Sequence, residues 1–522
     1  MAKSVINVNN INVKLKPKIK LKTRSKLKTR TKLKTKLVFK PKTKTVIRPK
    51  TKPKKTIRRT QPKSNGSRVD INGWIKISLT GDAFERGYAH GSLLRKEIIE
   101  FIAMYEFYMP YLHGRSLDYF VDLTDDFMLP AIRKNYNEFY QEMRGIAQGA
   151  GVKVNYIVFL NCCMSVPYLY ENLASVLHLH ASGRTLSRKY ADAARETNNT
   201  TTREGAIRRQ YVDDRCSAFI ATGSHTKDGS IVCAHNSFSP YIDGQYGNII
   251  IEIRPRRGFA ITMQSYPGFI FSCADFFVTS AGIIGTETTI GGFNKYENRD
   301  PICCRIRHCM QYGRTMDDYV STLLHRNSGD YANSWLFGDI NTNEIMRLEL
   351  GLEYYNVERT RDGVFIGCNI VDDPRIRNLE CSQNTGFDDV RHSRGARLVR
   401  LTELVNLHRG KLDLVVAAKI IADHYDVYLK KDVLSSRGIC KHCEYDDASN
   451  SPNPDARPYE MVGATDGAVI DSTTARAMSM ILRFGSSCGT PFDAGEMCAK
   501  HPQWSQLRPY LKDRPNQPWT KV

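Results

Sequence analysis

The sequence predicts an α+β protein with largely antiparallel sheets, preceded by a basic segment that forms no core. Residues 1–69 contain 25 Lys and Arg and no Asp or Glu. Residues 70–178 show mainly helical periodicity. From residue 216 onward, short β-branched and apolar runs are interspersed with pairs of helical segments, without a regular βαβ order. This pattern is typical of α+β layers.

The basic segment accounts for the net charge of +22, since the remaining chain has 51 basic and 54 acidic residues. Such a density of like charge opposes burial and predicts disorder. The segment is a candidate arm for a polyanion, such as nucleic acid, an anionic membrane or a capsid surface; a solubilising extension is the alternative. No secretory signal core or membrane span is visible, which favours a cytoplasmic or particle-associated location over secretion.

Residues 81–112 predict the first long helix, because their apolar residues recur at helical spacing. Asp82 is a candidate N-cap. Gly87 and Gly91 lie four residues apart and therefore on one face. Glycines cost helix stability, so their presence predicts close packing against another backbone.

A polar, weakly patterned stretch at residues 180–215 separates the helical part from the strands. Segments of this length inside a compact protein are usually functional or processed. We therefore predict four regions: a tail at 1–69, a helix-rich part at 70–179, a candidate processed linker at 180–215, and a catalytic part at 216–522.

Strands dominate the region that follows. The runs "CSAFIATG" and "SIVCAHNSF" are joined by Lys-Asp-Gly and predict a hairpin. Residues 333–351 predict a second hairpin and residues 463–485 a closing strand pair. Further strands are expected at 247–255, 259–268 and 276–290, and helices at 301–325, 394–407 and 411–425.

Cys216 opens the first strand directly after the linker. A thiolate is a strong nucleophile but needs a nearby base. If the chain is cut between Arg215 and Cys216, the new α-amino group, with a reference pKa of roughly 7.7–8.0, can serve as that base. Taken alone, a cysteine at a strand start is more commonly a buried core residue.

The other cysteines do not predict a disulfide framework, because the spacing of the fourteen is irregular. Cys440 and Cys443 form a Cys-x-x-Cys pair, but a zinc site needs two further ligands of similar local spacing and none is evident. His442 lies between the two cysteines and is not expected to turn to the same metal. The sequence therefore predicts no metal or other cofactor.

Several motifs together resemble N-terminal-nucleophile (Ntn) hydrolases of the phospholipase B-like group and of the penicillin acyltransferase-type group. They appear in the same order over about 85% of the chain. The motifs are "ERGYAHG" (85–91), "RCSAFIATGSHTKDGSIVCAHN" (215–236), "TSAGIIGTETTIGGFN" (279–294), "NSGDYANSWLFGDINTNEIMRLELG" (327–351), "GICKHCE" (438–444) and "GATDGAVIDSTTA" (463–475).

The resemblance implies an αββα sandwich and a precursor that is cut before Cys216, whose sulfur then attacks an acyl carbonyl. It also implies that Asn333 is an oxyanion-hole donor. His235 and Asn236 would contact the free amine or the acyl oxygen. Arg397 would favour the thiolate, with Arg394 as the second candidate.

Two further residues are substrate-binding candidates under this resemblance. Thr288 belongs to the Glu-Thr-Thr run. Related enzymes carry an Asp shortly after the second strand of the nucleophile hairpin, where this chain has Phe238 and Ser239. Asp243 is the next acid and is the candidate replacement.

Two functions remain open from the sequence. The first is an autoprocessed cysteine hydrolase or acyltransferase that cleaves a small acyl amide or ester, such as a peptide-like molecule or a phospholipid. The second is a weak or inactive Ntn-fold protein that binds nucleic acid, a membrane or a capsid through residues 1–69. A conventional Cys-His-Asn protease is disfavoured, because no local signature for one is visible.

Overall fold

The computed structural model describes residues 65–179, 186, 188–198, 215–382, 387–452 and 457–522. The chain divides into residues 1–60 and residues 61–522, and the described residues all belong to the second unit. The predicted basic arm and most of the predicted linker lie outside the described residues. The first strand begins at Gly66, within the range predicted for the arm.

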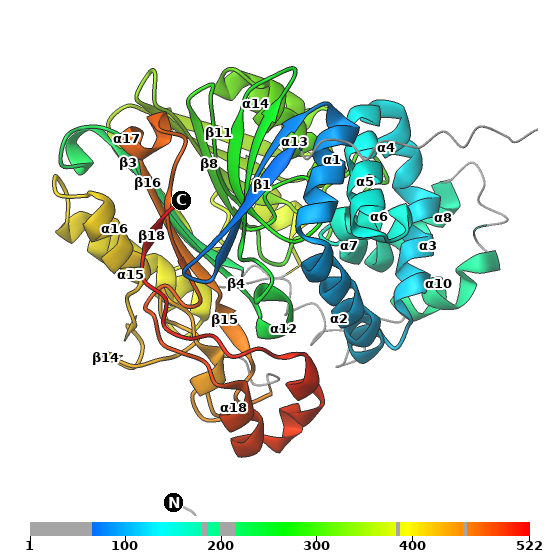
Figure 1. Cartoon of the computed structure of the whole chain (residues 1–522). Helices are drawn as coiled ribbons and strands as arrows, with labels where there is room; N and C mark the ends of the chain where they lie inside the picture. Colours follow the sequence, from blue (N-terminus) through cyan, green and yellow to red (C-terminus); the bar gives the residue numbers. More distant parts are fainter. Residues whose placement is uncertain (1–64, 180–185, 187, 199–214, 383–386, 453–456) are drawn as a thin grey trace, which may run out of the picture. The chain divides into compact units, whose positions relative to one another are not determined.

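Two sheets stack face to face, and helices cover both outer faces (Figure 1). The prediction of an α+β fold with mainly antiparallel sheets and an αββα order of layers is confirmed. The apolar side chains between the sheets come from both of them, for example Ile220 and Cys233 from one sheet and Ile250 and Ile284 from the other. Burial of this double-sided apolar surface is what holds the layers together.

The first sheet has nine strands, and every neighbouring pair is antiparallel except β2 and β5. Its strands, in spatial order, are β1 (Gly66–Ile71), β2 (Trp74–Gly81), β5 (Ile249–Pro255), β6 (Ile261–Ser265), β7 (Phe276–Thr279), β8 (Ile283–Thr289), β9 (Asn333–Asp339), β10 (Glu344–Leu350) and β11 (Tyr355–Thr360).

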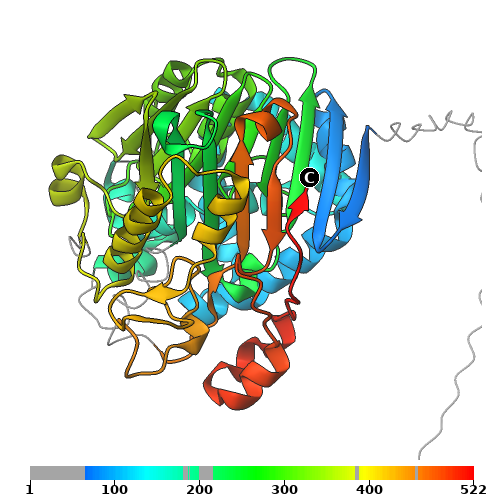
Figure 2. The ribbon, with the colours of Figure 1, turned by 90° about the vertical axis from the view of Figure 1, so that its left-hand side faces the viewer.

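The second sheet has seven strands, and Figure 2 looks onto it from its helix-covered side. Its order is β12 (Gly363–Gly367), β3 (Cys216–Thr222), β4 (Val232–Pro240), β16 (Asp466–Asp471), β17 (Ile481–Phe484) and β18 (Thr520–Lys521), with β15 (Val462–Ala464) paired to the end of β4. A separate two-stranded ribbon is formed by β13 (Tyr425–Asp426) and β14 (Lys431–Asp432).

Helices of the N-terminal half and one central helix pair cover the first sheet through one large apolar core. They are α1 (Ala83–Leu93), α2 (Arg95–His113), α3 (Leu117–Phe127), α4 (Leu129–Asn135), α5 (Asn137–Ala150), α6 (Val154–Cys162), α7 (Val166–Glu171), α8 (Leu173–Leu179), α10 (Ala191–Asn198), α13 (Ile302–Tyr312) and α14 (Met316–Leu324).

The second sheet is covered by α15 (Ser393–Leu407) and α16 (Leu414–Ile421). Shorter elements are α12 (Tyr241–Gly244), α17 (Ser472–Arg476) and α18 (Ala494–Lys500), the 3₁₀ turns at Gly223–His225, Cys443–Tyr445 and Pro502–Tyr510, and a π turn at Ile376–Glu380. None of the described helices is both long enough and apolar enough to cross a bilayer.

The first predicted helix is two helices that meet at Leu94. Asp82 caps α1 in a capping box with Glu85, as predicted. The close packing predicted from its glycines is also confirmed. A Cβ atom on Gly87 would lie 2.1 Å from the carbonyl oxygen of Glu142, and one on Gly91 would lie 2.0 Å from that of Ile146, both on α5.

Both predicted hairpins are present. Strands β3 and β4 pair with Cys216 opposite Ser237. Strands β9 and β10 are joined by a turn in which Asn343 has a φ of 57°, a left-handed conformation that Asn tolerates. The first hairpin places Cys216 at one end of the second sheet, next to the ends of β8 and β9.

Candidate active site

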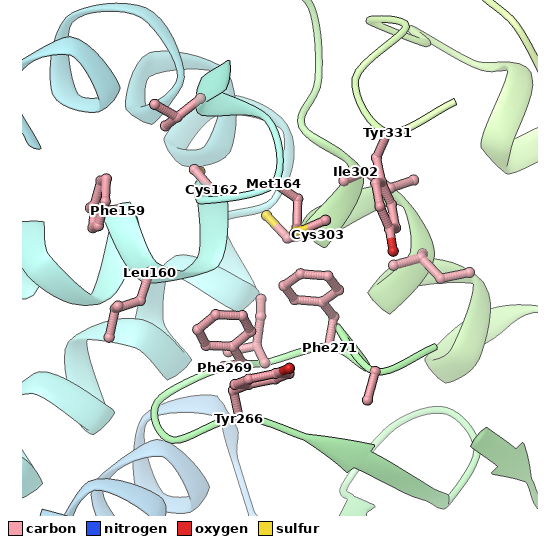
Figure 3. Packing of buried hydrophobic residues seen from close by; sticks show 14 of the residues in the cluster. Phe159, Leu160, Cys162, Met164, Tyr266, Phe269, Phe271, Ile302, Cys303 and Tyr331 are labelled. Atoms are coloured by element: carbon pink, nitrogen blue, oxygen red, sulfur yellow. The ribbon is translucent and has the colours of Figure 1, made fainter. Parts of the chain in front are cut away.

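The thiol of Cys216 lies on the wall of a cavity of ≈ 40 Å³, which has room for only a few water molecules. Aromatic residues of α2 and of the β6–β7 connection form much of the wall, among them Phe101, Tyr266 and Phe269. Figure 3 shows Tyr266 and Phe269 side by side within a packed group of buried residues that also includes Met164 and Tyr331, and all four line the cavity. The nucleophile candidate therefore lines a small cavity whose walls are aromatic and carry charged side chains as well.

The backbone of Cys216 is fixed by two buried side chains. Arg397 of α15 donates a hydrogen bond from Nη1 to the Cys216 carbonyl oxygen (2.6 Å) and another to Ser217 Oγ (3.2 Å). Its Nη2 donates to Asn369 Oδ1 (3.0 Å), which also accepts the Cys216 N–H (3.3 Å). These bonds hold the first residue of β3 in one position.

Asn369 links this arrangement to the first sheet. Its Nδ2 donates to the carbonyl oxygen of Thr289 (2.9 Å) at the end of β8. Asn369 has a φ of 66°, a conformation that costs energy for any residue except glycine but is tolerated best by Asn. The sequence analysis missed Asn369, and no local pattern marks it.

An acidic cluster lies beside the thiol. Tyr331 Oη is 2.5 Å from Asp275 Oδ2 and 2.7 Å from Glu287 Oε1, and Cys216 Sγ is 3.9 Å from the same Glu287 oxygen. Glu287 can reach this point because β7 begins at Phe276, opposite Thr286, so that β8 continues past its neighbour. Glu287 and Tyr331 lie within two of the family-like motifs, but no sequence pattern assigned either residue a role.

Burial sets the protonation of this cluster. It raises the pKa of Glu287 to about 7, although the hydrogen bonds from Asp275 and Tyr331 oppose the shift, and it raises the pKa of Asp275 well above its usual range. The carboxyl pair therefore holds at least one proton at neutral pH. Burial also raises the pKa of the Cys216 thiol, and Glu287 raises it further.

Arg215 brings a positive charge to the same cavity. The residue lines the cavity together with Cys216 and Asp243, and its charge lowers the pKa of both Cys216 and Glu287. Burial raises the pKa of Asp243 to about 6, against the effect of Arg215. The structure thus places the predicted residues Arg215, Cys216 and Asp243 around one cavity.

Asn333 is the first residue of β9 and pairs with Thr289. Its side chain is fully buried, and neither Oδ1 nor Nδ2 has a hydrogen-bond partner among the described residues. A buried amide without partners costs stability unless something binds to it. Because Thr289 also accepts from Asn369, Asn333 is one strand away from the residues that hold Cys216.

The remaining predicted residues lie around this centre. His235 is on the β4 face that packs between the sheets, where burial lowers its pKa to about 3, so the ring is neutral. Thr288 lies between the sheets against Gly367. The structure does not bring Asn236 to the cavity, since its Nδ2 donates to Ile421 O, Ile439 O and Ser487 Oγ on the helix side.

Of the two arginine candidates, only Arg397 touches Cys216. Arg394 is one turn earlier on α15, and its guanidinium lies against Gly291. Phe238 stands where an aspartate was expected from the resemblance. Its backbone N–H donates to the carbonyl oxygen of Arg215. Its ring lies 5.1 Å from the guanidinium of Arg397.

A family model described as Phospholipase B matches residues 66–354, more than half of the chain. The chain belongs to the phospholipase B family. The phospholipase B-like resemblance predicted from the motifs is thereby confirmed. The matched residues include Cys216, Glu287, Tyr331 and Asn333, whereas Asn369 and Arg397 lie beyond them.

Curated members of this family are similar to the chain over shorter stretches. Putative phospholipase B-like 2 from Bos taurus is 35% identical over 144 residues, 24% of each chain. Putative phospholipase B-like 3 from Caenorhabditis elegans is 31% identical over 137 residues, 23% of each chain. The matched stretch spans only about a quarter of the length of these curated relatives.

Among solved structures, two variants of conjugated bile acid hydrolase from Clostridium perfringens are similar to the chain. Their TM-scores are 0.31 and 0.32, with 10% and 11% identity. Each comparison covers 51% of this chain and 89% of the other.

Proposed function

We propose that this member of the phospholipase B family is a cysteine hydrolase that cleaves an acyl amide or ester, and that cleavage of its own Arg215–Cys216 bond activates it. The observation that carries the proposal is the placement of Cys216. Its thiol faces the aromatic cavity, while Arg397 and Asn369 fix its carbonyl oxygen and its N–H. A structural core cysteine needs hydrogen bonds for its backbone groups, but it does not need a cavity beside its side chain.

The first step is attack of the Cys216 sulfur on the carbonyl carbon of Arg215. Glu287, 3.9 Å from the sulfur, accepts the thiol proton when it is ionised. Negative charge develops on the Arg215 carbonyl oxygen, which already accepts the N–H of Phe238. The C–N bond breaks, the nitrogen of Cys216 takes a proton, and a thioester remains.

Water then hydrolyses the thioester. The products are a carboxylate on Arg215, a free thiol and a free α-amino group on Cys216. Asn369 Oδ1, which accepts the N–H of the uncut chain, is placed to accept from this amine. With an ordinary pKa of roughly 7.7–8.0 the amine is partly neutral near neutral pH and serves as the base.

Turnover repeats the same chemistry on a substrate. The thiolate attacks the acyl carbonyl, and the unpartnered Asn333 amide is the proposed donor to the oxyanion. The cavity is too small for an acyl substrate while Arg215 lines it, and we propose that cleavage frees this residue to leave. The aromatic walls then suit an apolar acyl group, as in a phospholipid or an N-acyl amide.

The basic arm supports a separate proposal, binding of a polyanion through residues 1–69. The support for this proposal is that the excess positive charge is confined to residues 1–69, whereas the rest of the chain is close to neutral. Affinity for duplex DNA should fall steeply with salt in the full chain and be lost when the arm is deleted. Equal binding by both forms would remove the proposal.

Hydrolysis of a panel of acyl esters and N-acyl amides tests the enzymatic proposal. We expect the wild-type protein to release acid, and Cys216→Ala to lose at least ~10³-fold in rate. Cys233→Ala is the matched control, because Cys233 is a buried cysteine of the neighbouring strand that packs in the core. Full activity in Cys216→Ala would contradict the proposal.

A further inference from the structure

Four potential metal ligands from three separate loops converge behind the nucleophile hairpin. They are His424 after α16, Cys440 and His442 in the loop before the Cys443–Tyr445 turn, and Cys488 after β17. Their ligand atoms all lie within 4.8 Å of one another. His442 Nε2 is 3.4 Å from Cys440 Sγ and 3.4 Å from Cys488 Sγ.

These distances match those of a tetrahedral zinc site. Zinc binds sulfur at about 2.3 Å and imidazole nitrogen at about 2.0–2.1 Å, which places a ligand sulfur and nitrogen about 3.6 Å apart. Two thiolates and two imidazoles are a common donor set for structural zinc. From this convergence we infer that His424, Cys440, His442 and Cys488 bind one Zn²⁺ ion.

The surroundings orient the ligands as a metal site requires. Glu444 Oε1 lies 2.9 Å from His442 Nδ1, which leaves Nε2 directed at both sulfurs. Carboxylates commonly orient zinc-binding histidines in this way. The backbone N–H of Thr490 donates to Cys488 Sγ (3.2 Å), a bond that stabilises a thiolate. The Nε2 atom of His424 is buried and has no hydrogen-bond partner among the described residues.

The backbone segments that carry the ligands are already tied together. Asn236 donates its side-chain amide to Ile421 and Ile439 carbonyl oxygens and to Ser487 Oγ, and the last two residues directly precede Cys440 and Cys488. Cys440 N–H also donates to the carbonyl oxygen of Asp423, the neighbour of His424. These bonds already hold the backbone of the ligand segments in place, so little conformational entropy is lost when a metal binds.

The structure places the His442 ring against the sulfur of Cys440, which the sequence-based expectation for His442 did not anticipate. The two residues are two positions apart, and in an extended segment side chains at that spacing point to the same side, so the ring of His442 (φ −143°, ψ 79°) reaches this sulfur. The second cysteine of the site is Cys488, 48 residues away in the sequence, and not Cys443. Spacing within the Cys-x-x-Cys pair could not reveal this ligand set.

The zinc would clamp the loops against the strand that lies beside β3. Cys440 and Cys488 pack against Phe238 and Ala464 in a small apolar cluster. Phe238 in turn lies beside Arg397 and donates its N–H to Arg215. The ion would thus stabilise the side of the hairpin opposite the cavity without touching the reacting atoms.

Elemental analysis of the full-length protein, purified under reducing conditions without chelator, tests the inference. We expect one equivalent of zinc per chain. Substitution by Co²⁺ should give the ligand-field absorption of a tetrahedral ion and a thiolate-to-cobalt charge-transfer band. Chelation should lower Tm, and added Zn²⁺ should restore it. Absence of bound metal in the wild-type protein after incubation with Zn²⁺ would overturn the inference.

Matched cysteine variants locate the site. Cys440→Ser and Cys488→Ser should each lose the zinc and the charge-transfer band, while Cys443→Ser should keep both. If the first two variants fail to fold, the Co²⁺ spectrum and the zinc content of the wild-type protein still show whether the chain binds zinc through thiolates. A disulfide that joins Cys440 to Cys443 or to Cys488 in the reduced preparation, detected by alkylation and mass spectrometry, would also overturn the inference.

Discussion

The two sides of the β3–β4 hairpin differ in how their polar groups are satisfied. On the helix side, Asn236 Nδ2 and Arg397 make several hydrogen bonds to backbone and side-chain oxygens. On the side of the first sheet, the buried Asn333 amide has no partner among the described residues, and Glu287 has a raised pKa. The first side holds the nucleophile in place; the second keeps groups available for chemistry.

This difference shows how buried groups without hydrogen-bond partners can persist beside a well-bonded part of the same core. Unsatisfied buried groups cost stability, so they persist only where the surroundings enforce them. Here the hydrogen bonds on the opposite side of the same hairpin hold the backbone of Cys216 and so keep the neighbouring groups in place. Substitutions of Asn333 and Glu287 should therefore change rates. On the helix side, Arg397 touches Cys216 and should affect rates as well, whereas Asn236 does not touch it and should mainly affect stability.

After Cys216 itself, the largest effect is expected at Asn333. Asn333→Ala removes the proposed oxyanion donor, so kcat for acyl hydrolysis should fall ~10²–10³-fold with little change in KM. Self-cleavage should be less affected, because its oxyanion is placed at the N–H of Phe238. Steady-state kinetics and the rate of fragment appearance separate the two. An unchanged kcat would remove Asn333 from the site.

Glu287→Gln should slow self-cleavage about 10²-fold above neutral pH. Burial raises the pKa of Glu287 to about 7, so the wild-type residue is an available base only above that pH, and self-cleavage should accelerate as pH rises from 6 to 8. The variant should lack this rise. Glu349→Gln is the control, a buried carboxyl on β10 that binds the N–H groups of Asp372 and Asp373. The same pH profile in Glu287→Gln and wild type would exclude Glu287 as the base.

Arg397→Gln should lower both self-cleavage and turnover about 10- to 100-fold, because Cys216 loses the contact that fixes its carbonyl oxygen. Arg394→Gln, one turn earlier on the same helix, should retain most of both activities. The two variants show which of the two candidate arginines supports the thiolate, a choice that the sequence alone did not settle. Larger losses in Arg394→Gln than in Arg397→Gln would reverse the assignment.

The smallest catalytic effect is expected at Asn236. Asn236→Ala removes an amide that donates to three oxygens on the helix side, although Ile421 O keeps a second donor in Ser487 Oγ, so the free energy of unfolding should fall by about 1–3 kcal/mol. Turnover per folded molecule should change by less than about threefold. Urea denaturation and active-site titration measure the two quantities. A large fall in kcat at unchanged stability would return Asn236 to the catalytic residues.

Much of the fold was predictable because it rests on local chemistry. The capping box at Asp82, the glycine face of α1 and both hairpins follow from short patterns, and the structure confirms them. The break at Leu94 was missed because the apolar periodicity continues across it. Tertiary packing, which a single helix pattern does not contain, decides where one helix ends.

The site was predictable only in part, for a similar reason. Cys216 is marked by its place at a strand start, and the resemblance indicated Asn333 and Arg397. Asn369 and Cys488 belong to segments far away in the sequence and reach their partners through the fold. Glu287 was visible in a motif. Its carboxylate reaches the thiol because β7 begins only at Phe276, opposite Thr286, which the motif does not reveal.

The mass of each polypeptide in the purified protein, measured under denaturing and reducing conditions, shows whether the bond between Arg215 and Cys216 is cut. Wild type should yield a fragment whose first residue is Cys216 with a free α-amine, and Cys216→Ala should yield one uncut chain. An active wild-type protein with the bond between Arg215 and Cys216 intact would contradict the proposed activation by self-cleavage.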